Sequence, residues 1–270
     1  MSNVVLITGA SSGIGKATAA LLAKSGYTVY GAARRVEGMN DLLPLGVKPI
    51  AMDVSVDTSI VEGVNHILKE EGRIDLLVNN AGFGLYGAVE EVSMQDARYQ
   101  LEVNVIGLAR LIQLVLPGMR RQHAGKIVNI TSVGGKIVSP FGAWYHVSKF
   151  GVEALSDALR LEVASLGIDV IVIEPGGVKT EWGDIAMQNL ERTSSKGPYA
   201  NKANKMVALA QKFANRNAEP SLIAQLILKA VTVAKPKTRY HAGFMAGTVL
   251  FAKKWLSDRQ FDKMILSQLK

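Results

Sequence analysis

A tyrosine and a lysine stand four residues apart near the middle of the chain, and a serine lies shortly before them. Tyr145 and Lys149 open a segment of helical periodicity, so their spacing places both side chains on one helix face. A phenol has a pKa of about 10, and a nearby ammonium favours its ionised form, which brings proton exchange closer to neutral pH. Ser132 ends a predicted strand, where its hydroxyl can hydrogen-bond a substrate oxygen. These residue types predict an acid/base site, although a Tyr-Lys pair alone also occurs by chance on helix surfaces.

A glycine-rich turn follows the first apolar strand and precedes a helical pattern. Glycine permits positive φ and lets the backbone approach a phosphate, whose charge is stabilised by the free amides and the dipole at a helix start. The spacing is Gly-x-x-x-Gly-x-Gly, which differs from the usual dinucleotide fingerprint. A purely structural turn is the alternative, and the flanking strand and helix weaken it. The predicted pyrophosphate turn comprises Gly9, Ser11, Ser12, Gly13, Ile14 and Gly15.

The end of the second strand indicates which nicotinamide cofactor fits. An acidic residue there would bind the ribose hydroxyls of NAD, whereas an arginine neutralises the 2′-phosphate of NADP. The chain has alanine where the acid would stand, followed by Arg34 and Arg35, so NADP is favoured over NAD. Two exposed loop arginines are the alternative. Asp53, which ends the third strand before Val54, would either meet the adenine edge or cap the next helix.

Short β-branched runs alternate with longer helical patterns along the chain. The strand-like runs are apolar on both faces, as a covered parallel sheet requires, and parallel neighbours need crossover helices. This rhythm predicts an α/β fold, a Rossmann-type doubly wound parallel sheet with helices on both faces. The predicted strands are 4–8, 28–33, 48–53, 76–79, 126–132 and 169–174, with a weak edge strand from 240. The predicted helices are 15–25, 59–70, 95–122, 144–166 and 221–233.

The length of 270 residues suits a single domain, 1–270. Residues 182–217 break the rhythm with Gly, Pro, Ser, Asn and Lys, and they predict an inserted substrate loop or lid. Residues 235–270 are predicted to form a basic, helical C-terminal extension. Residues 191–270 carry 15 Lys and Arg against 4 Asp and Glu, which suggests an anionic partner or substrate head, or only a solvated face.

Composition excludes several classes of protein. The chain has no cysteine, which excludes a disulfide scaffold, a thiolate metal site and a cysteine nucleophile. The four histidines lack carboxylate companions at ligand spacing, so no metal site is predicted. No export signal and no run of about 18 apolar residues is visible, so we expect a cytoplasmic protein without a transmembrane segment. The run 244–255 leaves peripheral membrane contact open, whereas nothing supports nucleic-acid binding.

The chain resembles the short-chain dehydrogenase/reductase family over nearly its whole length. Besides the glycine turn and the Tyr-x-x-x-Lys pair, the matching motifs are Asn79-Asn80-Ala81-Gly82, Asn104, Ser132, and Pro175-Gly176 with Thr180. The resemblance implies that a hydride moves between the nicotinamide and a carbonyl or alcohol carbon while Tyr145 exchanges the proton. It also implies that Ser132 polarises the substrate oxygen, that Lys149 lowers the pKa of Tyr145 and holds the nicotinamide ribose, and that Asn104 supports a water-linked proton relay.

The same resemblance implies the remaining cofactor contacts and an assembly state. Asn80, Ala81 and Gly82 would line the adenosine side, and Pro175, Gly176, Val178 and Thr180 would bracket the nicotinamide carboxamide. Arg34 occupies the position where NADP-preferring relatives place a basic residue. Relatives pair the helices that correspond here to 95–122 and 144–166, so a homodimer or homotetramer is expected.

The chain looks like the branch that contains 17β-hydroxysteroid dehydrogenases, retinol dehydrogenases and acyl-dihydroxyacetone-phosphate reductases, which act on bulky apolar carbonyls. Large apolar residues of the last third would line or cover such a pocket, or would only pack the C-terminal helices: Trp182, Met187, Phe213, Phe244, Met245, Phe251 and Trp255. An NADP(H)-binding regulatory or sensor protein on the same fold is the alternative function. The retained Tyr, Lys, Ser and Asn set argues against it.

Overall fold

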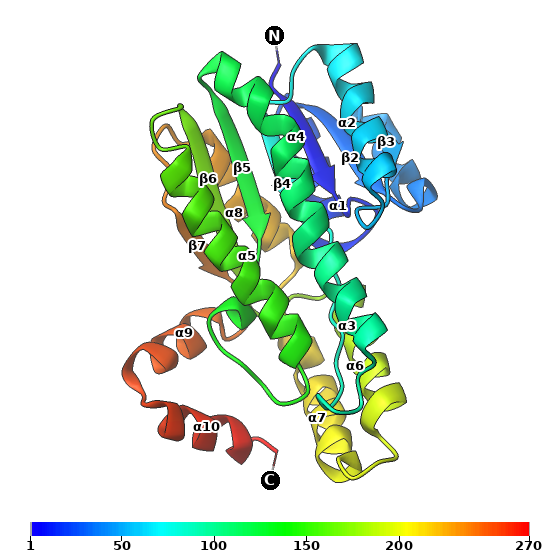
Figure 1. Cartoon of the computed structure of the whole chain (residues 1–270), viewed down its shortest axis with the longest axis vertical. Coiled ribbons are helices and arrows are strands. Elements are labelled where there is room, and N and C mark those ends of the chain that lie inside the picture. The colour runs from blue at the N-terminus through cyan, green and yellow to red at the C-terminus, as the bar shows by residue number, and fades with distance from the viewer. Residues whose placement is uncertain (1, 270) are drawn as a thin grey trace.

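The computed structural model describes residues 2–269 and contains one seven-stranded parallel sheet (Figure 1). The strand order is β3-β2-β1-β4-β5-β6-β7, and every neighbouring pair is parallel. The strands are β1 Val4–Thr8, β2 Thr28–Ala33, β3 Lys48–Ala51, β4 Leu76–Asn79, β5 Gly125–Ile130, β6 Ile168–Pro175 and β7 Arg239–Ala242. The predicted Rossmann-type doubly wound α/β fold is confirmed.

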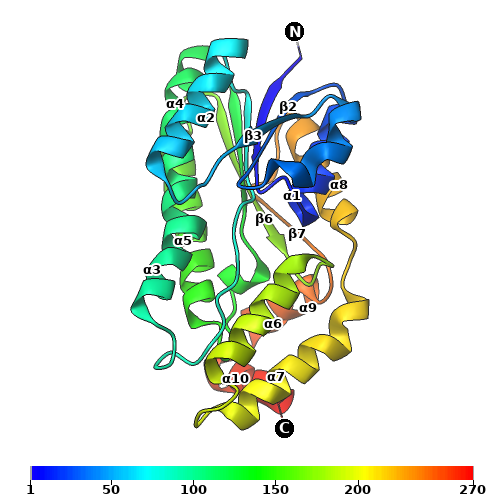
Figure 2. The same ribbon diagram turned by 90° about the vertical axis from the view of Figure 1, so that its right-hand side faces the viewer.

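Helices cover both faces of the sheet, as Figure 2 shows edge-on. One core layer packs α2, α4 and α5 against the sheet through residues such as Ile67, Leu111 and Val152. The other layer packs α1 and α8 through Leu22 and Ile227. The helices are α1 Gly13–Lys24, α2 Asp57–Glu71, α3 Met94–Leu101, α4 Gly107–Gln122, α5 Ala143–Glu162, α6 Glu181–Ser194, α7 Ala200–Phe213, α8 Pro220–Thr232, α9 Ala246–Trp255 and α10 Asp258–Ser267.

The strand order creates the position for a site. The chain runs outward from β1 through β2 to β3 and then returns to place β4 on the other side of β1. At such a reversal the loops after neighbouring strands diverge, which opens a crevice at the carboxyl ends of the strands. The glycine turn follows β1, and the Asn79-Asn80-Ala81-Gly82 motif follows β4, so both predicted motifs flank this point.

Several predicted boundaries change in the structure. The strand predicted as 48–53 ends at Ala51, and the strand predicted as 126–132 ends at Ile130, so Asp53 and Ser132 lie in the loops that follow. The helix predicted as 95–122 is divided by a π-helical turn, Glu102–Ile106, between α3 and α4. The weakly predicted edge strand is present as β7, paired with β6.

The segment predicted as a lid loop is helical. Residues 182–217 fold mainly into α6 and α7, which pack against each other below the carboxyl edge of the sheet (Figures 1 and 2). Helix-forming residues dominate these runs, and Gly197 and Pro198 only separate them. The predicted C-terminal helical extension consists of β7, α9 and α10.

One described helical stretch, Met94–Gln122, is long and apolar enough to cross a membrane. In the structure its second half, α4, buries Leu108, Leu111, Val115 and Met119 against the sheet and α2. Core helices of globular domains meet the same length and composition criteria.

Candidate active site

The carboxyl ends of β1, β4, β5 and β6 open into one large cleft. Its volume is about 1860 Å³, and it runs from the glycine turn after β1 to α6 and α7. All the predicted site residues line its wall except Gly15 and Asn104, which lie behind it. The sequence motifs, separated by up to 171 positions between Gly9 and Thr180, therefore converge on one space.

The glycine turn has the backbone geometry that a phosphate cradle needs. Gly9 and Gly13 adopt positive φ angles of 67° and 54°. A Cβ on Gly15 would lie 2.3 Å from the carbonyl oxygen of Gly9 and 2.4 Å from Nδ2 of Asn80, so only glycine lets α1 begin this close to the turn. The Asn80 amide in turn donates to the carbonyl of Thr8 at 2.9 Å, which joins the two motifs.

Two basic side chains lie at the end of β2, where no acid is present. Arg34 and Arg35 are exposed and line the cleft. Nη1 of Arg34 donates to the hydroxyl of Tyr99 on α3 at 3.1 Å, so the guanidinium is directed across the mouth of the cleft. A planar, permanently charged guanidinium suits a phosphate monoester at this position.

Asp53 is engaged in the turn that leads into α2. Its Oδ1 accepts from the backbone N–H of Ser55 at 2.9 Å and from the Ser55 hydroxyl at 2.6 Å. Of the two roles expected for Asp53, the structure thus shows the local one: its side chain forms an Asx-type turn before α2. An adenine contact from its cleft-facing edge stays a prediction.

Asn104 lies on the π-helical turn and is almost fully buried. Its Oδ1 accepts from the Phe83 N–H at 3.1 Å, and its Nδ2 donates to the Phe83 carbonyl at 3.0 Å and to Ser148 Oγ at 3.0 Å. The extra residue of a π turn re-aims one side chain out of the helical register, and such turns recur at functional sites. Here it directs Asn104 toward the loop after β4 and the helix that carries Tyr145.

Ser132 and Tyr145 meet at the floor of the cleft. The Ser132 side chain hydrogen-bonds that of Tyr145 and also donates to the carbonyl of Pro175 at 3.3 Å. Ser132 Oγ accepts from the N–H of Gly134 at 3.0 Å, which fixes the hydroxyl after the end of β5. The arrangement presents two hydroxyl groups to a single point in the cleft.

Burial dominates the electrostatics of Tyr145. Removal from water raises the pKa of its phenol above the ordinary value, and the neighbouring Tyr86 raises this pKa further, whereas the hydrogen bond to Ser132 lowers it. The phenol is therefore protonated and ready to donate. The role of Lys149 in lowering the pKa of Tyr145, which the family resemblance implies, stays a prediction.

Lys149 lies on the same face of α5 as Tyr145, as predicted, and its ammonium is fully buried. Nζ donates to the carbonyl of Ile130 at 2.9 Å, one residue before Thr131. Burial lowers the pKa of Lys149 to about 8, and the nearby carboxylate of Glu153 opposes this shift. Lys149 thus titrates close to the physiological range.

Two features of the site were missed from the sequence. His146 is buried beside Tyr145, and its Nε2 accepts from the N–H of Ser139 at 2.9 Å, so the hydrogen is assigned to Nδ1, which donates to the carbonyl of Gly134 at 2.8 Å. It ties together both ends of the loop between β5 and α5. Tyr86, whose ring centroid lies 5.9 Å from that of Tyr145, forms another wall. No periodicity or spacing marks either residue.

The end of the cleft that α6 and α7 border, here called the lid end, is lined by apolar and aromatic side chains. Trp182, Met187 and Phe213 line it as predicted, together with Tyr86 and Val207. The other large apolar residues predicted for the pocket do not line the cleft: Phe244 packs on the ring of Phe213 at 5.8 Å, and Met245, Phe251 and Trp255 are exposed on or before α9. Of the two roles expected for these four residues, the wall of the pocket is therefore not the one that the structure shows.

The basic character of the last third of the chain does not reach the cleft. Over residues 191–269, no Lys or Arg lines it, whereas Glu191 and Glu219 do. The charged residues that α6 adds, Glu181 and Asp184, are also acidic. Among residues 2–269, which the structure describes, no three His, Asp or Glu side chains form a metal-binding group.

Comparisons with known proteins agree with this geometry. Residues 3–190 match the short chain dehydrogenase family. The chain is 36% identical over 263 residues to a 3-ketodihydrosphingosine reductase from Bacteroides thetaiotaomicron, a match that covers 96% of this chain and 95% of that protein. A short-chain dehydrogenase from Streptomyces avermitilis superposes with a TM-score of 0.82 at 31% identity, over 100% of this chain and 97% of the other. An actinorhodin polyketide ketoreductase with NADPH gives a TM-score of 0.76 at 32% identity, over 89% and 95% of the two chains. The chain belongs to the short-chain dehydrogenase/reductase family of oxidoreductases.

Proposed function

We propose that this oxidoreductase uses NADP(H) to interconvert a bulky apolar ketone or aldehyde with the corresponding alcohol, and that Tyr145 is its acid and base. The observation that carries the proposal is the paired hydroxyls of Ser132 and Tyr145 at the floor of the cleft, with Lys149 behind them. When bound, the nicotinamide supplies the hydride or takes it up. The roles of the protein's own groups follow from their placement.

In the reductive direction Ser132 orients the carbonyl oxygen, and Tyr145 gives its proton to that oxygen as negative charge develops on it. The raised pKa of the buried phenol keeps that proton in place until it is needed. Lys149, at the pKa of about 8 that burial gives it, supplies positive charge to the cleft from the same face of α5 as Tyr145. Asn104 connects this helix with the Phe83 backbone, from which a water-linked relay would begin.

The residues of the glycine turn fit a dinucleotide. Gly9 and Gly13 adopt positive φ and pack against the loops after β4 and β6, where a Cβ would meet Ala81 and Thr180, and the start of α1 offers amides and a positive dipole to a pyrophosphate. Arg34 and Arg35, with no acid at the end of β2, favour NADP(H) over NAD(H). Structural relatives of the chain have been solved with NADP(H), which supports the same choice.

The lining of the lid end supports a long or bulky apolar substrate. Tyr86, Trp182, Met187 and Val207 provide apolar wall, and the ionisable groups there are mostly acidic. This charge disfavours the anionic substrate head that the basic C-terminal third suggested. A long-chain ketone with a neutral or cationic head fits better, which agrees with the name of the 3-ketodihydrosphingosine reductase relative. The resemblance to steroid and retinol enzymes leaves those carbonyls as alternatives.

The test is NADPH oxidation, followed by absorbance, with a panel of 3-keto long-chain amines, steroid ketones, retinal, long aldehydes and acyl-dihydroxyacetone phosphate. We expect turnover with a long-chain ketone and little with the anionic substrate. Binding of NADPH without turnover across the panel would instead support the regulatory alternative, which the intact set of Tyr145, Ser132, Lys149 and Asn104 disfavours.

We further infer a cytoplasmic homodimer or homotetramer. Relatives pair through the helices that correspond to α4 and α5, and α5 leaves the apolar side chains of Val147, Phe150 and Leu161 exposed. Light scattering after gel filtration tests the assembly, and a monomer at micromolar concentration would contradict it.

A further inference from the structure

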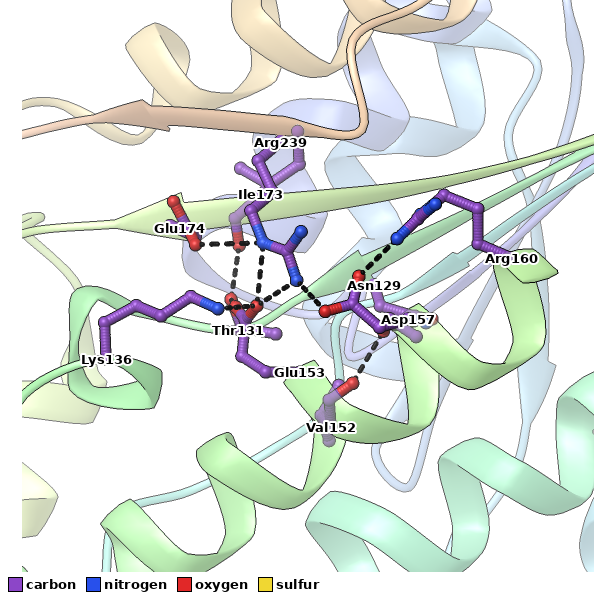
Figure 3. A network of polar contacts seen from close by, with 11 residues as sticks. Asn129, Thr131, Lys136, Val152, Glu153, Asp157, Arg160, Ile173, Glu174 and Arg239 are labelled. Atoms are coloured by element: carbon purple, nitrogen blue, oxygen red, sulfur yellow. Dashed lines mark hydrogen bonds and ion pairs between the residues drawn. The ribbon is translucent and has the colours of Figure 1, made fainter.

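A cluster of charged side chains lies directly behind the candidate site and has no part in the chemistry proposed above. Figure 3 shows Arg239 reaching from β7 between Glu174 on β6 and the carboxylates of Glu153 and Asp157 on α5. Glu153 and Glu174 are only 4% and 3% exposed. Buried carboxylates are costly unless they are paired and hydrogen-bonded, so the partners of each one matter.

Glu153 is the centre of this cluster. Its Oε1 accepts from the hydroxyl of Thr131 at 2.6 Å. Its Oε2 forms ion pairs with Nζ of Lys136 at 2.8 Å and with Nε and Nη2 of Arg239, both at 3.0 Å. One buried carboxylate thus joins the end of β5, the turn after Ser132, and β7.

Two of these segments, and the helix that carries Glu153, contain or adjoin residues of the candidate site. Thr131 stands between Ile130, whose carbonyl accepts from Lys149, and Ser132. Lys136 follows the short helical turn that begins after Ser132. Glu153 itself lies one helical turn beyond Lys149 on α5.

The contact between these segments is too tight for a side chain to intervene. A Cβ on Gly135 would lie 2.9 Å from Cγ of Glu153 and 3.1 Å from the carbonyl oxygen of Lys149. The turn after Ser132 therefore rests directly on the helix that carries Lys149, at the level of Glu153. A shift of Glu153 would move both.

We propose that Glu153, braced by Lys136 and Arg239, is a positioning residue that holds Ser132 and Lys149 in their productive arrangement. The proposal rests on the proposed function for its catalytic consequence, but the arrangement itself can be measured without a substrate. Arg239 contributes the bidentate contact that Lys136 cannot make.

The charge of Glu153 also acts on Lys149. Glu153 raises the pKa of the Lys149 ammonium against the effect of burial. The charged groups around Glu153 are Lys136, Arg239 and Glu174 from neighbouring elements and Asp157 from the same helix. Because Glu153 is the charge that opposes the effect of burial on Lys149, removal of that charge lowers the pKa of Lys149.

The chain offers a matched control for this test. Asp157 lies on the same helix and pairs with Arg239 at 2.7 Å, but it is more exposed and contacts neither Thr131 nor Lys136 in any recorded hydrogen bond or ion pair. We therefore compare Glu153→Gln with Asp157→Asn. Glu153→Gln keeps an oxygen that can accept from Thr131, removes the charge, and replaces the oxygen that accepted from Lys136 and Arg239 by an amide NH2 group. Lys136→Met, at a side chain that is one-third exposed, is a second variant that should fold.

We expect Glu153→Gln to lower kcat about tenfold or more while the Kd for NADPH, measured by fluorescence, changes by less than about threefold. Lys136→Met should lower kcat by a smaller factor, and Asp157→Asn should leave it within about twofold of the wild type. Arg239→Lys should retain more activity than Arg239→Met. A folded Glu153→Gln protein with kcat within twofold of the wild type, or an equal loss in Asp157→Asn, would overturn the proposal.

A second readout requires no turnover. In protein labelled with ¹³C at the lysine Cε, the NMR signal that is absent from Lys149→Met reports the titration of Lys149. This titration should move to lower pH in Glu153→Gln and stay in place in Asp157→Asn. If no carbonyl is reduced by the wild type, the proposed function fails while this shift still decides the positioning role, and an unshifted titration overturns that role.

Discussion

The ring of Trp182 lies 4.9 Å, centroid to centroid, from the ring of Tyr145, at the point where α6 meets the floor of the cleft. The ring of Tyr86 contacts both, edge-on to Trp182 at 6.1 Å. Tyr145 is therefore enclosed by aromatic surface on the lid side. This enclosure links the apolar end of the cleft to the electrostatics of Tyr145, the proposed proton donor, because burial is the main cause of its raised pKa.

Trp182→Ala should raise the KM for a long-chain ketone about tenfold, which corresponds to about 1.4 kcal/mol of lost contact. A small ketone that does not reach Trp182 should show a much smaller change in KM, and it serves as the control. The same kinetic measurements on both ketones check this. Equal changes for the two substrates would show that Trp182 supports the fold rather than the substrate.

Arg34→Asp should lower the ratio of kcat/KM for NADPH to that for NADH by about a hundredfold, because an attractive guanidinium is replaced by a repulsive carboxylate beside the 2′-phosphate. Tyr99→Phe removes the recorded hydrogen-bond partner of Arg34 and should change the ratio by less than about threefold. An unchanged ratio in Arg34→Asp would mean that the arginine is only a surface charge.

Gly15→Ala should lower the free energy of unfolding by about 1–3 kcal/mol and weaken NADPH binding, because the added Cβ meets backbone at 2.3 Å. Gly118→Ala on α4 is the control. Its nearest neighbours would be the ends of flexible side chains at 3.9 and 4.0 Å, and we expect stabilisation of about 0.5–1 kcal/mol from helix propensity. Chemical denaturation of both variants measures the difference. Equal stability of Gly15→Ala and the wild type would contradict the close packing of α1 on the turn.

Burial raises the pKa of Glu174 to about 7, and the nearby Glu153 carboxylate adds to the effect, although Lys136 and Arg239 oppose it. The folded state therefore binds more protons than the unfolded state between pH 4.5, the ordinary value, and about pH 7. Stability should fall as pH rises through this window, by up to about 3 kcal/mol from this group. Glu174→Gln should make the free energy of unfolding less dependent on pH in this window. Thermal unfolding from pH 5 to 8 checks it, and identical slopes in the two proteins would contradict the shifted titration.

The fold was largely predictable because each strand is a short, β-branched run buried on both faces, and that pattern has few other solutions. The predicted strand ends were too long at Asp53 and Ser132, since polar residues there bond into turns rather than to a neighbouring strand. The π-helical turn at Asn104 was not predictable. It depends on hydrogen bonds to Phe83, 21 residues earlier, that no local pattern reveals.

The convergence of Ser132, Tyr145 and Lys149 on one cleft followed from their positions at the carboxyl edge. The positions of the side chains that support these three residues did not follow from the sequence. Glu153 and Arg239 are 86 residues apart and meet only because β7 pairs with β6 beside α5. Residues 182–217 were predicted as a loop because Gly, Pro, Ser, Asn and Lys interrupt the strand-helix rhythm there, whereas the runs on either side of Gly197 and Pro198 form α6 and α7. Sequence patterns thus located the residues of the candidate site, but they did not reveal the side chains that hold those residues in position.

The most direct test of the account is Tyr145→Phe. The variant removes one hydroxyl from the floor of the cleft and leaves the aromatic contacts with Tyr86 and Trp182 in place. We expect kcat for ketone reduction to fall to less than about 1% of the wild-type value while the Kd for NADPH stays within about twofold. A correctly folded Tyr145→Phe protein that retains a tenth or more of wild-type turnover would contradict the assignment of Tyr145 as the proton donor.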